Sequence, residues 1–168
     1  MRPSWDQYWI GLAFFISARS RDAETKHGCI IVDGSNRIVG TGYNSFIKNI
    51  DDEALPNTRP EKYPFMIHSE ENAILNSKVP PSQCRGEVTA YVTGKCCNTC
   101  LQRLIQAEVS RIVMAKRKGT QLESEKTEND FRKIVALSRV KIEVIEPRPE
   151  WMLEIFKTLY ENSPNPPF

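Results

Sequence analysis

The order of the expected elements predicts an α/β fold, a three-layer α/β/α domain built on a mixed five-stranded sheet. A helical pattern comes first, two short apolar runs follow, and helices and strands then alternate almost to the end of the chain. Such alternation produces crossover connections, so the later strands should be parallel and helices should cover both faces of the sheet. The 168 residues are enough for one domain with a core and few for two.

The first helix is expected over residues 5–16. Ser4 can cap it, and Gln7 stands three residues later, as a capping box requires. The apolar residues of this segment recur at helical spacing and would form one broad face; they are Trp5, Tyr8, Trp9, Leu12, Phe15 and Ile16.

A β-hairpin is expected next, with strands at residues 29–32 and 37–40 separated by the turn sequence Asp-Gly-Ser-Asn. Residues 45–67 are polar and rich in proline, and we expect a functional loop without secondary structure. We predict one catalytic domain over residues 1–161 and a loose, proline-rich tail at residues 162–168. The remaining helices are expected at residues 68–76, 97–107, 128–138 and 150–160, and the remaining strands at 88–93, 111–115 and 141–145.

Composition narrows the function classes. Hydrophobic content is 40% and charged content is 26%, which is ordinary for a globular protein. The net charge of +2 does not indicate nucleic-acid binding. No apolar run is long enough to cross a bilayer. The N-terminus does not resemble a secretory signal. We therefore expect a cytoplasmic protein with neither membrane nor nucleic-acid partners.

The most informative pattern is a histidine and two cysteines at metal-ligand spacing. His68 starts one expected helix, and Cys97 and Cys100 stand three residues apart at the start of another, so both sulfur atoms should point the same way. A helix N-terminus favours thiolate over thiol. One imidazole and two thiolates suit a zinc ion and leave its fourth position free for water.

Glu70 would make such a zinc site catalytic. The pattern H-x-E followed by P-C-x-x-C is the signature of zinc-dependent nucleobase deaminases, although Cys96 here replaces the proline. From the same helical turn as His68, Glu70 can reach the water without replacing it. It would take a proton from the water, deliver it to the ring nitrogen beside the attacked carbon, and later protonate the leaving amine.

Two other interpretations of the cysteines remain open from the residues alone. A C-x-x-C pair can be a redox centre, but a thioredoxin-like site does not explain His68 or Glu70. A structural zinc site needs a fourth protein ligand, for which Cys96 is the candidate, and adjacent residues rarely both bind one metal well.

With these residues the chain resembles the cytidine deaminase superfamily and, within it, the deoxycytidylate (dCMP) deaminases. The zinc motif specifies the superfamily, and the Gly-Tyr-Asn and Glu-x-Asn-Ala-Ile segments are typical of dCMP deaminases. The resemblance implies the cytidine deaminase-like fold. It runs through the segments Arg19-Ser20, Gly40-Thr41-Gly42-Tyr43-Asn44, Lys62-Tyr63-Pro64, His68-Ser69-Glu70-Glu71-Asn72-Ala73-Ile74 and Tyr91-Val92-Thr93.

The resemblance implies one catalytic Zn²⁺ on His68, Cys97 and Cys100, with Glu70 as the proton shuttle. The reaction would be hydrolytic deamination of dCMP to dUMP and ammonia, and dUMP would supply thymidylate synthesis. Asn44 would contact the sugar and base of the substrate, and the other residues that the resemblance places at the substrate are Ser69, Thr93 and Arg19.

The resemblance also implies regulation and assembly. Residues 47–52 lie where the family binds a regulatory deoxynucleoside triphosphate, with dCTP as activator and dTTP, together with Mg²⁺, as inhibitor. Such enzymes are typically homo-oligomers, namely hexamers. The residues expected at the regulatory site are Lys48, Asn49, Asp51 and Asp52.

Several residues depart from the family pattern close to the site. Ser69 stands in place of alanine, and its hydroxyl could add a hydrogen bond near the ring. Residues 116–118, Lys-Arg-Lys, occupy the region where the family has a tyrosine. They could hold a phosphate, but we favour a solvated charged loop.

Three other functions compete with a dCMP deaminase. A deaminase of tRNA or single-stranded DNA would need a concentrated basic face with aromatic stacking, against which the near-neutral charge argues. A deaminase of the free nucleoside remains open because phosphate contacts are not evident. A zinc module without activity is the third, and replacement of Glu70 by alanine would distinguish it from an enzyme.

Overall fold

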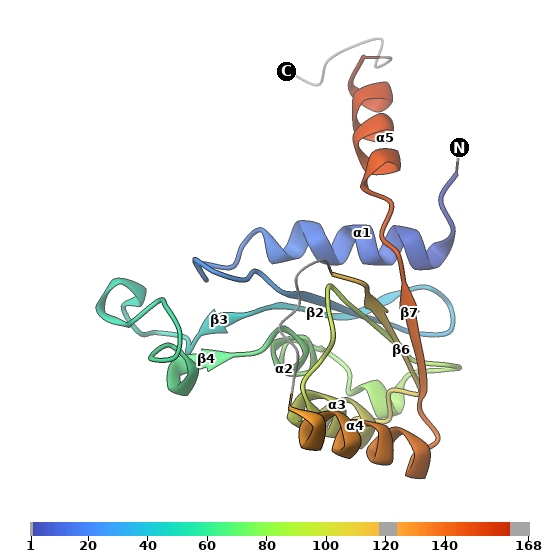
Figure 1. Ribbon diagram of the computed structural model, residues 1–168. Helices are drawn as coiled ribbons and strands as arrows, with labels where there is room; N and C mark the ends of the chain where they lie inside the picture. Colours follow the sequence, from blue (N-terminus) through green and yellow to red (C-terminus); the bar gives the residue numbers. More distant parts are fainter. Residues whose placement is uncertain (1, 118–123, 162–168) are drawn as a thin grey trace.

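The computed structural model describes residues 2–117 and 124–161 (Figure 1). The expected tail at residues 162–168 lies outside them. Within the described residues, no helix combines the length and the apolar character needed to cross a membrane. The helices and strands are α1 Trp5–Ser17, β1 Gly28–Val32, β2 Ile38–Tyr43, β3 Ser45–Phe46, β4 Met66–Ile67, α2 Ser69–Leu75, β5 Thr89–Val92, α3 Asn98–Gln106, β6 Arg111–Ala115, α4 Glu125–Leu137, β7 Lys141–Ile145 and α5 Pro149–Glu161.

The main sheet has five strands in the order β2-β1-β5-β6-β7. Strand β1 pairs antiparallel with both β2 and β5, whereas β5, β6 and β7 are parallel to one another. The predicted mixed five-stranded sheet, parallel in its later half, is therefore confirmed.

Helices cover both faces of this sheet, with α1 on one side and α2, α3 and α4 on the other (Figure 1). Successive strand residues point to opposite faces. In β1, Ile30 and Val32 pack with α1, while Cys29 and Ile31 pack in the core beneath the other helices. All of β1 is buried, so this strand is apolar without alternation.

The cap predicted for α1 is present, but only half of the capping box forms. The Ser4 hydroxyl accepts a hydrogen bond from the backbone N–H of Gln7 at 3.3 Å. The Gln7 amide does not return to the cap. It donates to the carbonyl of Glu146 at 2.9 Å and accepts from the N–H of Arg148 at 3.1 Å. Gln7 thereby ties α1 to the connection between β7 and α5.

The segment at residues 45–67 is not free of secondary structure, contrary to the prediction. Strands β3 and β4 form a two-stranded antiparallel sheet that joins its ends, and short 3-10 turns lie between them at Asp52–Ala54 and Tyr63–Phe65. Each strand has only two residues, too few to show an alternating pattern. Strand β2 also extends to Tyr43, beyond the predicted end at residue 40.

Helix α5 leaves the sheet; its first turn contacts α1, and the helix then projects away from it (Figure 1). Gly11 of α1 allows the close approach, because a Cβ atom there would lie 2.8 Å from the sulfur of Met152 and 2.9 Å from the Trp151 ring. A groove of about 830 Å³ runs between the two helices, and its lining includes Phe14, Phe15 and Phe156.

Candidate metal centre and active site

The first half of the site is held by the start of helix α2. His68 is the N-cap residue, and Ser69 and Glu70 are in the first turn. Two glycines of β2 let this helix lie directly on the sheet. A Cβ atom at Gly42 would lie 2.2 Å from the Ser69 carbonyl oxygen, and one at Gly40 would lie 2.2 Å from that of Ala73. The glycines of the Gly-x-Gly segment thus set the height of His68 and Glu70 above the sheet.

The second half is held by the start of helix α3. Cys97 is its N-cap residue, and the Cys97 sulfur accepts a hydrogen bond from the N–H of Cys100 at 3.4 Å. The preceding residue, Cys96, points the other way. Its side chain is 1% exposed and its sulfur lies 3.9 Å from the sulfur of Met114 in the core.

The three predicted ligands meet. His68 Nδ1 lies 3.6 Å from the Cys97 sulfur and 3.4 Å from the Cys100 sulfur. In a tetrahedral zinc site, bond lengths near 2.0 and 2.3 Å place nitrogen and sulfur ligands about 3.5 Å apart. The donor set therefore fits a zinc ion. The hydrogen bond from the Cys100 side chain, aided by the His68 ring, lowers the pKa of Cys97, which favours the thiolate.

Among the described residues, the metal-ligand group contains only these three members. Cys96 is not one of them, which removes the fourth protein ligand that a structural zinc site would need. A zinc ion held by these three residues would keep a fourth position for water or substrate, as in catalytic zinc sites.

Glu70 lies beside the ligands, buried and 4% exposed. The Ser69 hydroxyl donates a hydrogen bond to Glu70 Oε2 at 2.8 Å. Burial raises the pKa of Glu70, so the carboxyl can hold a proton nearer neutral pH than an exposed glutamate can. Ser69, where the family pattern has alanine, thus orients the carboxylate.

A pocket of about 160 Å³ opens onto this group. It brings together the start of α2, the start of α3 and two loops distant in sequence. The residues that line it are Asp22, Thr25, His27, Asn44, Arg59, Lys62, Tyr63, Met66, His68, Ser69, Glu70, Lys95 and Cys97.

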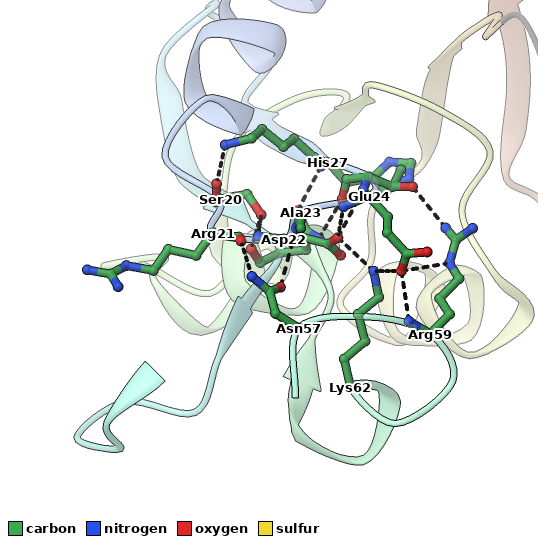
Figure 2. Close-up of polar contacts among 12 residues, drawn as sticks. Ser20, Arg21, Asp22, Ala23, Glu24, His27, Asn57, Arg59 and Lys62 are labelled. Atoms are coloured by element: carbon green, nitrogen blue, oxygen red, sulfur yellow. Dashed lines mark hydrogen bonds and ion pairs between the residues drawn. The ribbon is translucent and has the colours of Figure 1, made fainter. Parts of the chain in front are cut away.

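The pocket wall contains a buried ion pair that sequence reasoning missed. The Lys62 ammonium is 2% exposed and lies 2.6 Å from Asp22 Oδ1 and 2.8 Å from Glu24 Oε2 (Figure 2). A buried charge is tolerated only when paired in this way. In the sequence Lys62 belongs to the Lys-Tyr-Pro segment, and nothing local there signals a partner 40 residues away.

Asn44 lines the pocket, but each polar atom of its side chain already has a partner within the protein. Its carbonyl oxygen accepts from the N–H of His27 at 2.7 Å, and its amide donates to Asp22 Oδ2 at 3.0 Å and to the Thr25 carbonyl at 2.9 Å. Here Asn44 braces the loop that forms the wall. Direct contact between Asn44 and a substrate stays a prediction.

Two further residues expected at the substrate lie elsewhere. The Thr93 hydroxyl is buried and accepts a hydrogen bond from the N–H of Gly28 at 3.0 Å, and Thr93 does not line the pocket. Arg19 lines two neighbouring polar pockets rather than this one.

One of those neighbouring pockets, of about 310 Å³, contains most of the residues expected at a regulatory site. Lys48, Asn49 and Asp52 line it together with Arg19. Asp51 is not in the lining, and its carboxylate instead accepts from the N–H of Glu53 at 3.0 Å to cap a 3-10 turn.

A sequence model of the cytidine and deoxycytidylate deaminase zinc-binding region matches residues 3–116. The chain belongs to this family. Human deoxycytidylate deaminase is 34% identical over 115 residues, which are 65% of this chain and 63% of the human protein. A probable deoxycytidylate deaminase of Caenorhabditis elegans is 36% identical over 110 residues, or 63% of this chain and 54% of the relative. The matches thus span less than two thirds of the length of these relatives.

Solved structures confirm the cytidine deaminase-like fold. The dCMP deaminase of cyanophage S-TIM5, in complex with dCMP and dUMP, is 18% identical and has a TM-score of 0.65, with 86% of this chain and 99% of the phage chain covered. A structure from a study of tRNA:A34 deaminases is 16% identical with a TM-score of 0.53, covering 82% of this chain and 97% of that one. Because the fold occurs with different substrates, it does not decide the activity.

Proposed function

We propose that this chain catalyses the zinc-dependent hydrolytic deamination of dCMP to dUMP and ammonia, and so supplies dUMP for thymidylate synthesis. The observation that carries the proposal is the meeting of His68, Cys97 and Cys100, with ligand atoms within 4.8 Å of one another, beside the buried carboxyl of Glu70. The relatives named deoxycytidylate deaminase support dCMP as the substrate.

The residues of the pocket would have different roles in the reaction. Zinc held by His68, Cys97 and Cys100 would lower the pKa of a bound water toward neutrality and so supply a hydroxide nucleophile. Glu70 would take one proton from the water and pass it to the cytosine ring nitrogen next to the attacked carbon. It would then take the second proton from the new hydroxyl on that carbon and pass it to the amine, which leaves as ammonia. The Ser69 hydroxyl keeps the Glu70 carboxyl oriented between the two transfers.

Regulation by triphosphates is the second part of the proposal. The pocket lined by Lys48, Asn49 and Asp52 would bind dCTP as activator or dTTP with Mg²⁺ as inhibitor. Asp22 lines both this pocket and the metal pocket, which supports a connection between them.

We also propose a homo-oligomer, such as a hexamer, supported by the exposed aromatic rings of Trp5, Phe15 and Phe156 on α1 and α5.

A steady-state assay with dCMP, deoxycytidine and a cytosine-containing oligonucleotide tests the substrate, each with and without dCTP or dTTP. We expect the highest kcat/KM for dCMP, activation by dCTP and inhibition by dTTP. A higher kcat/KM for the oligonucleotide would instead assign the chain to polynucleotide deamination, and equal values for dCMP and deoxycytidine would indicate a nucleoside deaminase.

A further inference from the structure

Three lysine or arginine side chains line the metal pocket, and they differ in how many of their donor groups already have partners within the protein. They are Arg59, Lys62 and Lys95. A fourth basic group, His27, does not add charge, because burial lowers its pKa to about 4. An anionic part of a ligand needs a cation whose donors are not all used within the protein.

Lys62 is committed to the fold. Its buried ammonium lies between Asp22 and Glu24 at 2.6 and 2.8 Å. Movement of this group toward a ligand would leave a buried carboxylate without its partner, which is strongly unfavourable.

Lys95 is also committed. Its ammonium lies 2.5 Å from Glu128 Oε2 and 4.6 Å from the centre of the Phe131 ring. Arg117, from the basic segment at residues 116–118, donates to the Lys26 carbonyl at 2.7 Å, lies 5.8 Å from the Phe14 ring and does not line the pocket. Residue 118 lies outside the described residues.

Arg59 has binding capacity left. Its Nη2 donates to the Thr25 hydroxyl at 2.9 Å. Its Nε lies 3.9 Å from a Glu24 oxygen (Figure 2). Within the described chain, none of the hydrogen bonds of Arg59 uses Nη1. The Glu24 carboxylate is already occupied by Lys62 and by the N–H of Arg59, so its negative charge is compensated.

From this geometry we propose that Arg59 binds the 5′-phosphate of the substrate and so makes the enzyme prefer a nucleotide over the free nucleoside. The inference rests on the proposed function. A guanidinium is always charged and presents a planar fork of donors that matches a phosphate. Thr25 and Glu24 hold the fork at the pocket wall before the ligand arrives, so little side-chain freedom is lost on binding.

The test compares wild type, Arg59→Gln and Arg59→Lys on dCMP, deoxycytidine and a cytosine-containing oligonucleotide. For Arg59→Gln we expect kcat/KM for dCMP to fall roughly 10- to 100-fold, mainly through KM, because a charge-assisted contact is lost. Turnover of deoxycytidine should stay within about two-fold of wild type, since it has no phosphate. Arg59→Lys should recover part of the loss. The exposed Arg37 lies on the β1–β2 turn, and Arg37→Gln is the matched control, with wild-type values expected on all three substrates.

The deoxycytidine measurement keeps the test valid if the variant folds less well. The compared quantity is the ratio of kcat/KM for dCMP to kcat/KM for deoxycytidine, and both values come from the same protein sample. An unchanged ratio in Arg59→Gln overturns the role of Arg59 while the deaminase assignment stands. Wild type without preference for dCMP refutes the nucleotide substrate itself. A wild-type preference for the oligonucleotide that disappears in Arg59→Gln would show a phosphodiester contact and also overturn the inference.

Discussion

Single residues define the chemistry of this chain, and the ones that matter differ in how visible they are in the sequence. Motif spacing in the sequence predicts four site residues, and the structure brings all four together. They are His68, Glu70, Cys97 and Cys100. Their geometry follows from two helix starts, which is why local sequence predicts it. Cys96, an alternative ligand by sequence, is turned into the core.

Lys62 shows what the motifs do not reveal. Its carboxylate partners come from a loop about 40 residues earlier, and only the folded chain makes them neighbours (Figure 2). Asn44 and Thr93, expected at the substrate, instead make side-chain hydrogen bonds within the protein, Asn44 with His27, Thr25 and Asp22 and Thr93 with Gly28. Such pairings depend on long-range packing that no local pattern contains.

Replacement of Lys62 by methionine should destabilise the protein. The variant keeps the side-chain volume but leaves the buried Asp22 without its cation, and removal of one member of a buried ion pair costs about 3 kcal/mol or more. Urea unfolding followed by circular dichroism measures this. Lys78→Met, at an exposed lysine, should remain within about 0.5 kcal/mol of wild type. Equal unfolding free energies for the two variants would contradict the structural role of the ion pair.

At the scale of elements, the site depends on how closely α2 lies on the sheet. The order of helices and strands was predictable because long periodic segments carry their own signal. The two-residue strands β3 and β4 were not, since they are defined by pairing across the long loop at residues 47–65. The contact between α5 and α1 at Gly11 was likewise not predictable, because it depends on tertiary packing.

Gly42→Ala should displace α2 and disturb the metal ligands. The new Cβ would meet backbone atoms of Ser69 and Ala73 at 2.2 and 2.4 Å, and backbone cannot move aside cheaply. We expect a loss of about 3 kcal/mol in unfolding free energy and a lower zinc content per chain.

The control for this variant is Gly11→Ala, where the nearest atoms belong to the side chains of Trp151 and Met152. The gain in helix propensity of about 1 kcal/mol offsets part of that crowding, so stability should change by about 1 kcal/mol or less and zinc content should not change. Normal zinc binding in Gly42→Ala would show that the position of α2 does not depend on this contact.

At the scale of the whole molecule, the fold and the family are established, and the activity is a property to be measured on this chain itself. The match covers 65% of this chain and 63% of the human protein. The same fold also occurs in proteins that act on other substrates. The proposed activity therefore requires that these 168 residues hold zinc and use Glu70 to deaminate dCMP.

The most direct test is the rate of dCMP deamination by purified, zinc-loaded wild type and Glu70→Gln, with zinc measured per chain in the same samples. Glu71→Gln is the matched control, because Glu71 pairs with Arg103 and does not line the pocket. We predict one zinc per chain in all three proteins, wild-type turnover in Glu71→Gln, and a rate lower by roughly 10²- to 10⁴-fold in Glu70→Gln. Turnover of dCMP by Glu70→Gln within ten-fold of wild type, at roughly equal zinc content, would contradict the account.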